Sequence, residues 1–212
     1  MTQDASALRY AIEAIRAYAA ATVYEANDKL GDCSPQIRPL TSAARIVAPA
    51  YTVRLMPGSN EGVLRALALA PGGSVLVIDA GGTERSTAWG GTSSRLAQQR
   101  GLAGCVTNGA ARDLLELREI NIPVFACGVS VRGALKQHPG WLDVPIAVGD
   151  AVVHPGDLIV ADEDGVVVVA RERIEKVALR CVAQARLESD RERRLAEGES
   201  ILSVFNLRET GD

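Results

Sequence analysis

The sequence predicts an α/β protein with a parallel sheet at its centre, and three observations support this. Short apolar runs without polar alternation occur at residues 74–79, 104–107 and 123–127, and stretches with helical periodicity separate them. Strands that are apolar on both faces are typical of parallel sheets covered by helices. The 212-residue length and the 47% apolar content suit one domain with a substantial core. We therefore expect a single α/β domain over residues 1–212, built on βαβ units.

The segments before these strands are expected to begin with a helix. From Ser6 to Leu30 apolar residues recur at helical spacing and Gly31 follows, which predicts one long amphipathic helix with a glycine stop. Residues 45–55 predict a strand or a bent strand pair. Residues 60–70 predict a helix that ends before a Pro-Gly-Gly turn.

The segments after the strands differ in character. Pro155-Gly156 and Asp164-Gly165 mark tight turns between β-branched runs, which predicts a small antiparallel layer. Residues 171–197 have the pattern of a long charged helix that Gly198 ends, and a short apolar tail follows. The charged run in this helix is most simply a solvated face. The apolar faces of the two terminal helices suit either the core or an interface.

Composition excludes several classes of function. A net charge of -3, a pI near 5.5 and 4% aromatic residues provide neither the basic stripe nor the stacking platforms of nucleic-acid binders. The N-terminus lacks the pattern of a secretory signal, and no apolar run approaches membrane-spanning length. The cysteines at 33, 105, 127 and 181 form no CxxC motif. We expect a cytoplasmic protein with reduced thiols and no direct contact with nucleic acid or a membrane.

Several kinds of catalytic site are also disfavoured. His138 and His154 are the only histidines, so a histidine-rich zinc site or a Ser-His-Asp triad is hard to assemble. There is no Walker loop and no GxGxxG motif. Lys29, Lys136 and Lys176 lie in expected helix ends, loops or charged faces, whereas a Schiff-base lysine needs a desolvated pocket.

Oxygen ligands remain, and their densest set lies in the run NGAARDLLELRE. Here a glycine-containing loop is expected to lead into a helix that begins with Arg112-Asp113 and continues to Glu116, at the carboxyl ends of the strands where ligands collect. One carboxylate can hold Mg²⁺ or Mn²⁺, because these ions keep several waters. Alternatively, Arg112 and Glu116 form an i,i+4 surface pair and Asp113 only favours the helix N-terminus. The spacing by itself favours this simpler interpretation.

Several segments, in order, resemble a known protein family. The runs VIDAGG, WGG, GLAGCVTNGAARD, PVFACG and VHPGDLIVADEDGVVVV are similar to the family that joins 4-hydroxy-4-methyl-2-oxoglutarate/4-carboxy-4-hydroxy-2-oxoadipate aldolases to the RraA regulators of ribonuclease E. The resemblance covers roughly residues 40–200. Its most specific element is a glycine, twenty intervening residues, Arg-Asp, two residues and an acid. The residues that match this element are Gly91, Arg112, Asp113 and Glu116.

The resemblance implies a site for a small 2-oxo acid and a divalent metal ion. It makes Asp113 the direct protein ligand of Mg²⁺ or Mn²⁺, and it places Arg112 against the oxo or carboxylate oxygens of the substrate. A planar guanidinium suits such an anion, and glycines let the backbone approach it. The loop that would offer backbone N–H groups to the substrate carboxylate consists of Gly90, Gly91, Thr92 and Ser93. Without the resemblance, Gly90 and Gly91 are more simply a turn.

One departure affects the expected proton transfer. Many aldolases of this family carry an acid where this chain has Gly91. Asp79 and Glu84, on the neighbouring loop, are candidates to replace it, although an acid that closes a strand is more often a turn residue. The family also implies that a glutamate from the C-terminal region of an adjacent subunit approaches the site, and Glu192 or Glu199 are the candidates.

The expected function is therefore a metal-dependent lyase that acts on a small 2-oxo acid through a pyruvate enolate. The resemblance implies oxaloacetate decarboxylation, aldol cleavage of 4-hydroxy-4-methyl-2-oxoglutarate, or both, and the missing acid at position 91 favours decarboxylation. The alternative is a non-catalytic, RraA-like regulator that binds ribonuclease E, because fold alone does not fix function. The family fold is a layered α/β sandwich of swivelling-domain type, and its members assemble as trimers or hexamers.

Overall fold

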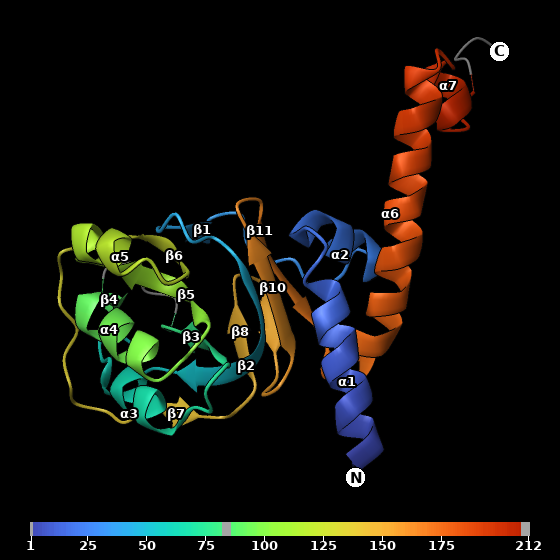
Figure 1. Ribbon diagram of the computed structural model, residues 1–212. Helices are drawn as coiled ribbons and strands as arrows, with labels where there is room; N and C mark the ends of the chain where they lie inside the picture. The colour runs from blue at the N-terminus through green and yellow to red at the C-terminus, as the bar shows by residue number, and fades with distance from the viewer. Residues whose placement is uncertain (1, 82–85, 209–212) are drawn as a thin grey trace.

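The computed structural model describes residues 2–81 and 86–208, in which helices and strands alternate over the central part of the chain (Figure 1). The helices are α1 (Thr2–Ile15), α2 (Ala20–Ala26), α3 (Glu61–Leu69), α4 (Gly91–Gln99), α5 (Leu114–Ile120), the 3₁₀ turn η1 (Arg171–Arg173), α6 (Ile174–Ala196) and α7 (Ile201–Val204). The strands are β1 (Arg38–Pro39), β2 (Ile46–Arg54), β3 (Val75–Asp79), β4 (Thr87–Trp89), β5 (Gly104–Ala111), β6 (Val124–Val129), β7 (Trp141–Leu142), β8 (Ile146–Val148), β9 (Ala151–Val153), β10 (Leu158–Asp162) and β11 (Gly165–Val169).

The main sheet is mixed, and its described strands follow the order β1-β6-β5-β3-β2-β10-β11. Strands β6, β5, β3 and β2 are parallel, which confirms the predicted parallel core. Strands β10 and β11 pair antiparallel around the predicted turn at Asp164, and β10 continues the sheet through β2. The hairpin β8-β9 forms a separate two-stranded sheet. The predicted antiparallel part thus partly extends the main sheet.

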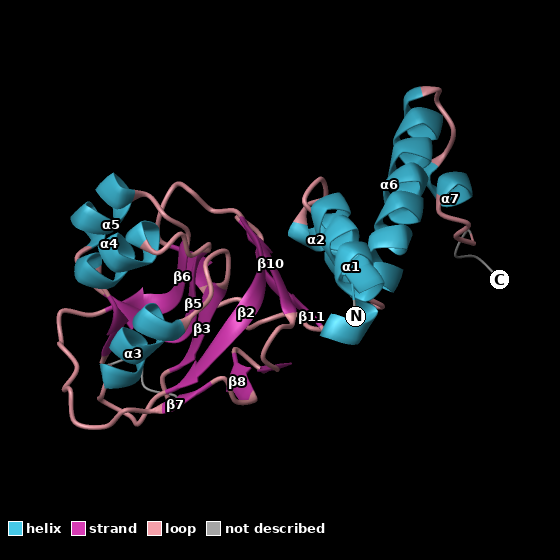
Figure 2. Ribbon diagram, turned by 60° about the horizontal axis from the view of Figure 1, so that its bottom comes forward, coloured by secondary structure: helices cyan, strands magenta, loops and turns pink. Residues whose placement is uncertain are grey.

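Helices α3, α4 and α5 over the parallel strands and helices α1, α2 and α6 over β10 and β11 lie on one face of the curved sheet, and the β8-β9 hairpin covers the other face (Figure 2). One apolar cluster lies between the parallel strands and helices α3, α4 and α5, and a second joins the sheet to the β8-β9 hairpin. A third joins β10 and β11 to α1, α2 and α6. Along β10 the alternation is plain, because Leu158 and Val160 face these helices while Ile159 and Ala161 face the second cluster. Both faces are buried, which explains apolar runs without polar alternation.

The prediction of one helix over Ser6–Leu30 is wrong, because α1 and α2 are separate helices. The side chain of Arg45 donates hydrogen bonds to the carbonyl of Tyr18 and to another carbonyl at the end of α1. The Asp162 carboxylate accepts a hydrogen bond from the backbone N–H of Ala20 at 2.6 Å and so caps α2. Arg45 directly precedes β2 and Asp162 ends β10, so both partners are distant in the sequence and leave no local signal.

The C-terminal helix matches the prediction more closely. Helix α6 ends at Ala196, and Gly198 follows in the left-handed region with φ +89°. Its first half packs against α1 and α2, while its second half extends past the sheet and carries α7 (Figure 1). Leu187, Leu195 and Phe205 on this arm are substantially exposed. Within the described residues, every helix is too short or too polar to cross a membrane.

Candidate functional site

Two parallel strands bring the predicted site residues to one edge of the sheet. Strand β4 pairs with the end of β5, with Trp89 opposite Ala111. Helix α4 begins just after β4, and Arg112 follows β5 directly, with its backbone N–H bonded to the Trp89 carbonyl at 3.1 Å. The start of α4 and the Arg112-Asp113 pair therefore lie side by side at the carboxyl ends of the strands. This is where ligands bind in parallel sheets.

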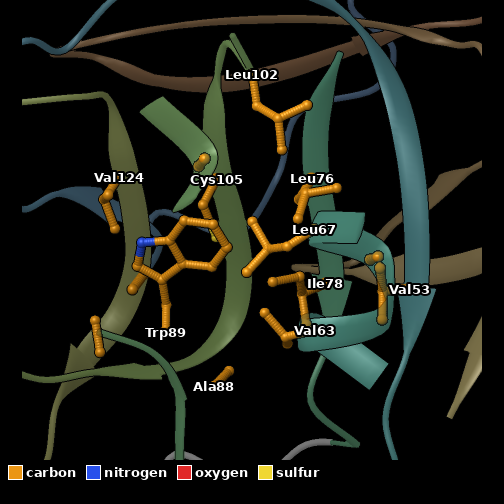
Figure 3. Packing of buried hydrophobic residues seen from close by; sticks show 14 of the residues in the cluster. Val53, Val63, Leu67, Leu76, Ile78, Ala88, Trp89, Leu102, Cys105 and Val124 are labelled. Carbon is orange, nitrogen blue, oxygen red and sulfur yellow. The ribbon is translucent and has the colours of Figure 1, made fainter. Parts of the chain in front are cut away.

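A buried tryptophan anchors this edge. The side chain of Trp89 packs among residues of the first apolar cluster, including Cys105, Val124 and Ile78 (Figure 3). Its indole N–H donates a hydrogen bond to the Ser94 hydroxyl in the first turns of α4 at 2.7 Å. A buried indole with a satisfied donor holds its neighbours in one position. The residue before the predicted glycine pair thus fixes where α4 begins.

The local structure around Asp113 differs from the prediction. The run that begins at Asn108 is strand rather than loop as far as Ala111, and α5 begins at Leu114. Asp113 is the residue before the helix and has φ 62°, the left-handed region that only glycine adopts without cost. Its side chain makes no capping hydrogen bond to α5, although Asp113 occupies the N-terminal position that the simpler interpretation gave it. Backbone strain of this kind is concentrated at functional sites.

The Asp113 carboxylate is held by one of its two oxygens. Oδ2 accepts a hydrogen bond from the Gly91 N–H at 3.2 Å and lies 3.4 Å from Arg112 Nε. Oδ1 has no hydrogen-bond partner in the part of the chain that the structure describes. The side chain is 41% exposed, so this oxygen can receive a ligand. A Cβ on Gly90 would lie 2.9 Å from Oδ2, so a side chain at position 90 would displace the Asp113 carboxylate.

Glu116 makes a contact that the sequence did not reveal. The predicted Arg112-Glu116 surface pair does not form. Instead, Arg95 Nε of α4 lies 2.7 Å from Glu116 Oε1. A Cβ placed on Gly91 would lie only 2.0 Å from Glu116 Oε2. The Glu116 carboxylate therefore fills the space that a side chain at position 91 would occupy. Because residue 91 is a glycine rather than an acid, the carboxylate of Glu116 can occupy the space beside it.

A small cavity of about 140 Å³ lies beside Arg112 and Asp113, and Glu116 is not among the residues that line it. This volume is below the roughly 300–1,000 Å³ typical of sites for drug-sized ligands, so it suits a compact molecule. The predicted residues that line it are Gly90, Thr92, Ser93, Arg112 and Asp113. Gly91 does not line it but binds Asp113. Since α4 begins at Gly91, the first N–H groups of the helix lack helical partners and face a site suited to an anion. Asn60 and Lys136 also line it, and sequence reasoning missed both.

Of the other candidate carboxylates, Asp79, Glu192 and Glu199, which the structure describes, do not line this cavity within one chain. Asp79 Oδ1 accepts hydrogen bonds from the Gly81 N–H and the Asn108 amide at 2.9 and 3.1 Å, so Asp79 has the turn role that its position favours. Glu84 lies outside the described residues. Glu192 and Glu199 belong to the arm formed by α6 and α7, far from α4 and α5 (Figure 1).

Glu199 is also engaged locally. Its carboxylate accepts hydrogen bonds from Arg194 Nε at 2.7 Å and from the Ser203 hydroxyl at 2.6 Å. The Arg194 guanidinium, and then the Ser203 hydroxyl, lower the pKa of Glu199 to about 2. Within this chain Glu199 therefore stays ionised and ties α6 to α7.

The donor set suits only some metal ions. In residues 2–81 and 86–208, no three His, Cys, Asp or Glu side chains gather as a metal site. A structural zinc site with four protein ligands is thus not formed by these residues. One accessible carboxylate beside polar backbone suits Mg²⁺ or Mn²⁺, which bind through one or two carboxylates and waters. Asp113 Oδ1 is the residue atom that fits this role.

Comparisons with known proteins agree on one family. The family model described as "RraA-like: Aldolase/RraA" matches residues 20–168. A Halalkalibacterium halodurans protein named "Putative 4-hydroxy-4-methyl-2-oxoglutarate aldolase" is 33% identical over 183 residues, which cover 86% of this chain and 87% of that protein. A Burkholderia multivorans protein of the same name is 40% identical over 136 residues, 64% of this chain and 82% of its own length.

Two solved structures resemble the chain over most of its length. An uncharacterized protein from Pseudomonas syringae pv. tomato has a TM-score of 0.81 at 26% identity, and the match covers 92% of both chains. The RNA-processing inhibitor RraA from Thermus thermophilis has a TM-score of 0.62 at 34% identity, over 66% of this chain and 86% of that one. The mixed α/β fold is therefore shared with proteins whose names indicate different functions.

Proposed function

The chain belongs to the RraA-like family, and we propose that within this family it is a lyase that releases pyruvate from a small 2-oxo acid. The substrates proposed are oxaloacetate, by decarboxylation, and 4-hydroxy-4-methyl-2-oxoglutarate, by aldol cleavage. The observation that carries the proposal is the placement of Arg112, the free Asp113 oxygen and the N-terminus of α4 around one small cavity. The names of the aldolase relatives support the same reaction class.

Each group has a separate task in binding. The N–H groups at the start of α4, near Thr92 and Ser93, bind the carboxylate next to the 2-oxo group. The Arg112 guanidinium binds the same end of the anion. Asp113 would hold Mg²⁺ or Mn²⁺, which supplies a Lewis acid for the 2-oxo group when bound.

Bond cleavage then places negative charge where Arg112 can stabilise it. When the C3–C4 bond breaks, its electron pair stays on C3 and delocalises onto the 2-oxo oxygen, giving the enolate of pyruvate. In decarboxylation the other fragment leaves as CO₂. A fixed guanidinium beside the developing oxyanion stabilises the transition state more than the substrate. A proton added to C3 completes the release of pyruvate.

Aldol cleavage also needs a base for the proton of the 4-hydroxyl group. The absence of an acid at Gly91 counts against this reaction when the sequence is considered alone. The position of Glu116 Oε2, where a side chain at 91 would begin, restores a carboxylate to that space. We therefore assign the base to Glu116, acting directly or through one water. This assignment makes aldol cleavage as well supported as decarboxylation.

We also propose that copies of the chain assemble, as a trimer or hexamer. The exposed apolar residues of the α6–α7 arm support association. Glu192 and Glu199 lie too far along this arm to serve the site of their own chain, so either would act only at a neighbouring copy.

The test is an assay of pyruvate release from both substrates with Mg²⁺ or Mn²⁺, and then with excess EDTA. Arg112→Ala and Asp113→Ala are compared with Arg118→Ala, an exposed residue of α5 that serves as control. We expect EDTA and each site variant to reduce release by at least about a hundredfold, and the control to match wild type. Release that persists unchanged in EDTA and in both variants would overturn the proposal. Copurification of a ribonuclease without turnover of either substrate would favour the regulator instead.

A further inference from the structure

Residues 130–138, which we call the strap, lie along one wall of the cavity. They follow β6 and precede β7, and they contain neither a helix nor a strand. Ala134 and Lys136 of the strap line the cavity together with Arg112. The strap is therefore a part of the site that the sheet and α4 do not build.

Thr87 holds the first end of the strap. Thr87 is buried, and its hydroxyl lies 2.9 Å from the Ser130 carbonyl oxygen and 2.8 Å from that of Arg132. The Thr87 N–H donates a further hydrogen bond to the Arg132 carbonyl at 3.0 Å. Because Thr87 belongs to β4, which leads directly into Gly90 and α4, this end of the strap is tied to the strand that carries the site.

Ser59, just before α3, holds the other end of the strap. Its buried hydroxyl donates a hydrogen bond to the His138 carbonyl at 3.1 Å and accepts one from the His138 N–H at 3.2 Å. The Leu135 N–H donates to the Gly58 carbonyl at 2.8 Å. Satisfied hydrogen bonds of buried polar groups keep a loop in one conformation. Ser59 does not itself line the cavity, so it holds the strap without facing the substrate.

Between these two fixed ends, Gly133 lies against the guanidinium of Arg112. A Cβ placed on Gly133 would lie 3.0 Å from Arg112 Nη1, inside the 3.4–4 Å of ordinary contact. Apart from its chain neighbours, no other heavy atom of the described residues would lie within 4 Å of this Cβ. The φ of Gly133 is not in the left-handed region, so the backbone does not require glycine. What the glycine provides is a close approach of the strap to Arg112.

We propose that the strap is a positioning element, in which Gly133 limits where the Arg112 guanidinium can lie. This inference rests on the proposed function, in which that guanidinium stabilises the enolate. Within the described residues, the Arg112 side chain has one charged partner, Asp113 Oδ2 at 3.4 Å from Nε, and it is 47% exposed. A long side chain with so few contacts stabilises a transition state only if its neighbours fix its orientation. The strap backbone supplies this restraint.

The first test adds one methyl group to the strap and measures pyruvate release from oxaloacetate with Mg²⁺. In Gly133→Ala the guanidinium must move by a few tenths of an ångström, and we expect kcat to fall about three- to tenfold with a smaller change in KM. The matched control is Gly128→Ala at the end of β6, where an added Cβ meets nothing within 4 Å. The control should match wild type, and urea unfolding of both variants should show the wild-type midpoint.

A double-mutant cycle shows whether the loss passes through Arg112. Lysine lacks the Nη1 atom that the new Cβ meets, so Gly133→Ala should change kcat by less than about twofold in the Arg112→Lys background. A loss of the same size in that background, or wild-type kcat in Gly133→Ala, would overturn the positioning role while wild-type turnover still upheld the proposed function. Absence of turnover in wild type would overturn both.

Removing the Ser59 hydroxyl gives an independent measurement at the fixed end of the strap. In Ser59→Ala, hydrogen exchange measured by mass spectrometry should be about fivefold or more faster for the peptide that contains the strap. Because the strap then holds Arg112 less firmly, kcat should fall about two- to fivefold. The control Arg118→Ala should match wild type in both measurements. Faster exchange with wild-type kcat, or unchanged exchange, would contradict the proposal.

Discussion

Replacing Gly91 by alanine tests whether the Glu116 carboxylate occupies the space that a side chain at position 91 would fill. The added Cβ would lie 2.0 Å from Glu116 Oε2 and 2.1 Å from its Cδ, far inside van der Waals contact. The Glu116 side chain is flexible and 33% exposed, so it can swing away without moving the backbone. Gly91 has no left-handed φ, so alanine suits the first position of α4. The substitution should therefore displace Glu116 selectively.

We expect Gly91→Ala to change the free energy of unfolding little and the rate of aldol cleavage strongly. Displacing Glu116 breaks its exposed ion pair with Arg95, which is worth about 0–1 kcal/mol. We expect the free energy of unfolding to change by less than about 1 kcal/mol. If Glu116 is the base for the 4-hydroxyl, aldol cleavage should fall by about 10²–10⁴-fold. Oxaloacetate decarboxylation needs no such base and should fall much less.

A double-mutant cycle measures this coupling. We would compare kcat/KM for aldol cleavage in Gly91→Ala, Glu116→Ala and the double variant, with urea unfolding as the stability control. Since both changes remove the same carboxylate, the double variant should be no slower than Glu116→Ala alone. Gly91→Asp combined with Glu116→Ala should recover part of the activity. Additive losses in the double variant, or full aldolase activity in Gly91→Ala, would refute the claim that the catalytic Glu116 carboxylate occupies the space of a side chain at position 91.

Three further predictions concern the fold. Asp162→Ala should lower the free energy of unfolding by about 1–2 kcal/mol, because it removes the hydrogen bond that caps α2 and the ion pair with Arg45. An unchanged midpoint in a urea titration would contradict this prediction. Gly31→Ala should cost more than about 3 kcal/mol, since Gly31 has φ +86° and its Cβ would lie 2.0 Å from a carbonyl of β11; wild-type stability in the same titration would contradict the close approach. Burial raises the pKa of Cys33 to about 12, that of Cys181 to about 11, and that of Cys105 well above its usual value, so these thiols stay protonated below those values. Iodoacetamide at pH 8 should alkylate them far more slowly in the native protein than in urea, and equal rates measured by mass spectrometry would disprove their burial.

The sequence predicted those parts of the fold that local pattern determines. Strands β3, β5 and β6 were predictable because burial on both faces removes polar alternation, and Gly198 marked the end of α6. The break between α1 and α2 was not predictable. It depends on Arg45, just before β2, and Asp162, at the end of β10, which are far from this break in the sequence.

The candidate site was likewise predicted only in part. The family resemblance implied that Arg112 and Asp113 share a site with the loop from Gly90 to Ser93, and in the structure they lie together because the paired strands β4 and β5 end at the same edge of the sheet. Asn60 and Lys136 were missed, since a parallel bridge between distant segments brings them together. Lys136 was considered only as a Schiff-base lysine, whereas an unpaired ammonium at a cavity wall is visible only in three dimensions.

Binding of Mn²⁺ to Asp113 is the most direct test of the proposed site. The electron paramagnetic resonance signal of free Mn²⁺ measures its affinity for wild type, Asp113→Asn and the control Arg118→Ala. Asp113→Asn keeps the shape of the side chain and removes its charge, so it should lower the affinity by at least about 10–100-fold, while the control should match wild type. An affinity in Asp113→Asn equal to that of wild type would contradict the assignment of the metal to Asp113.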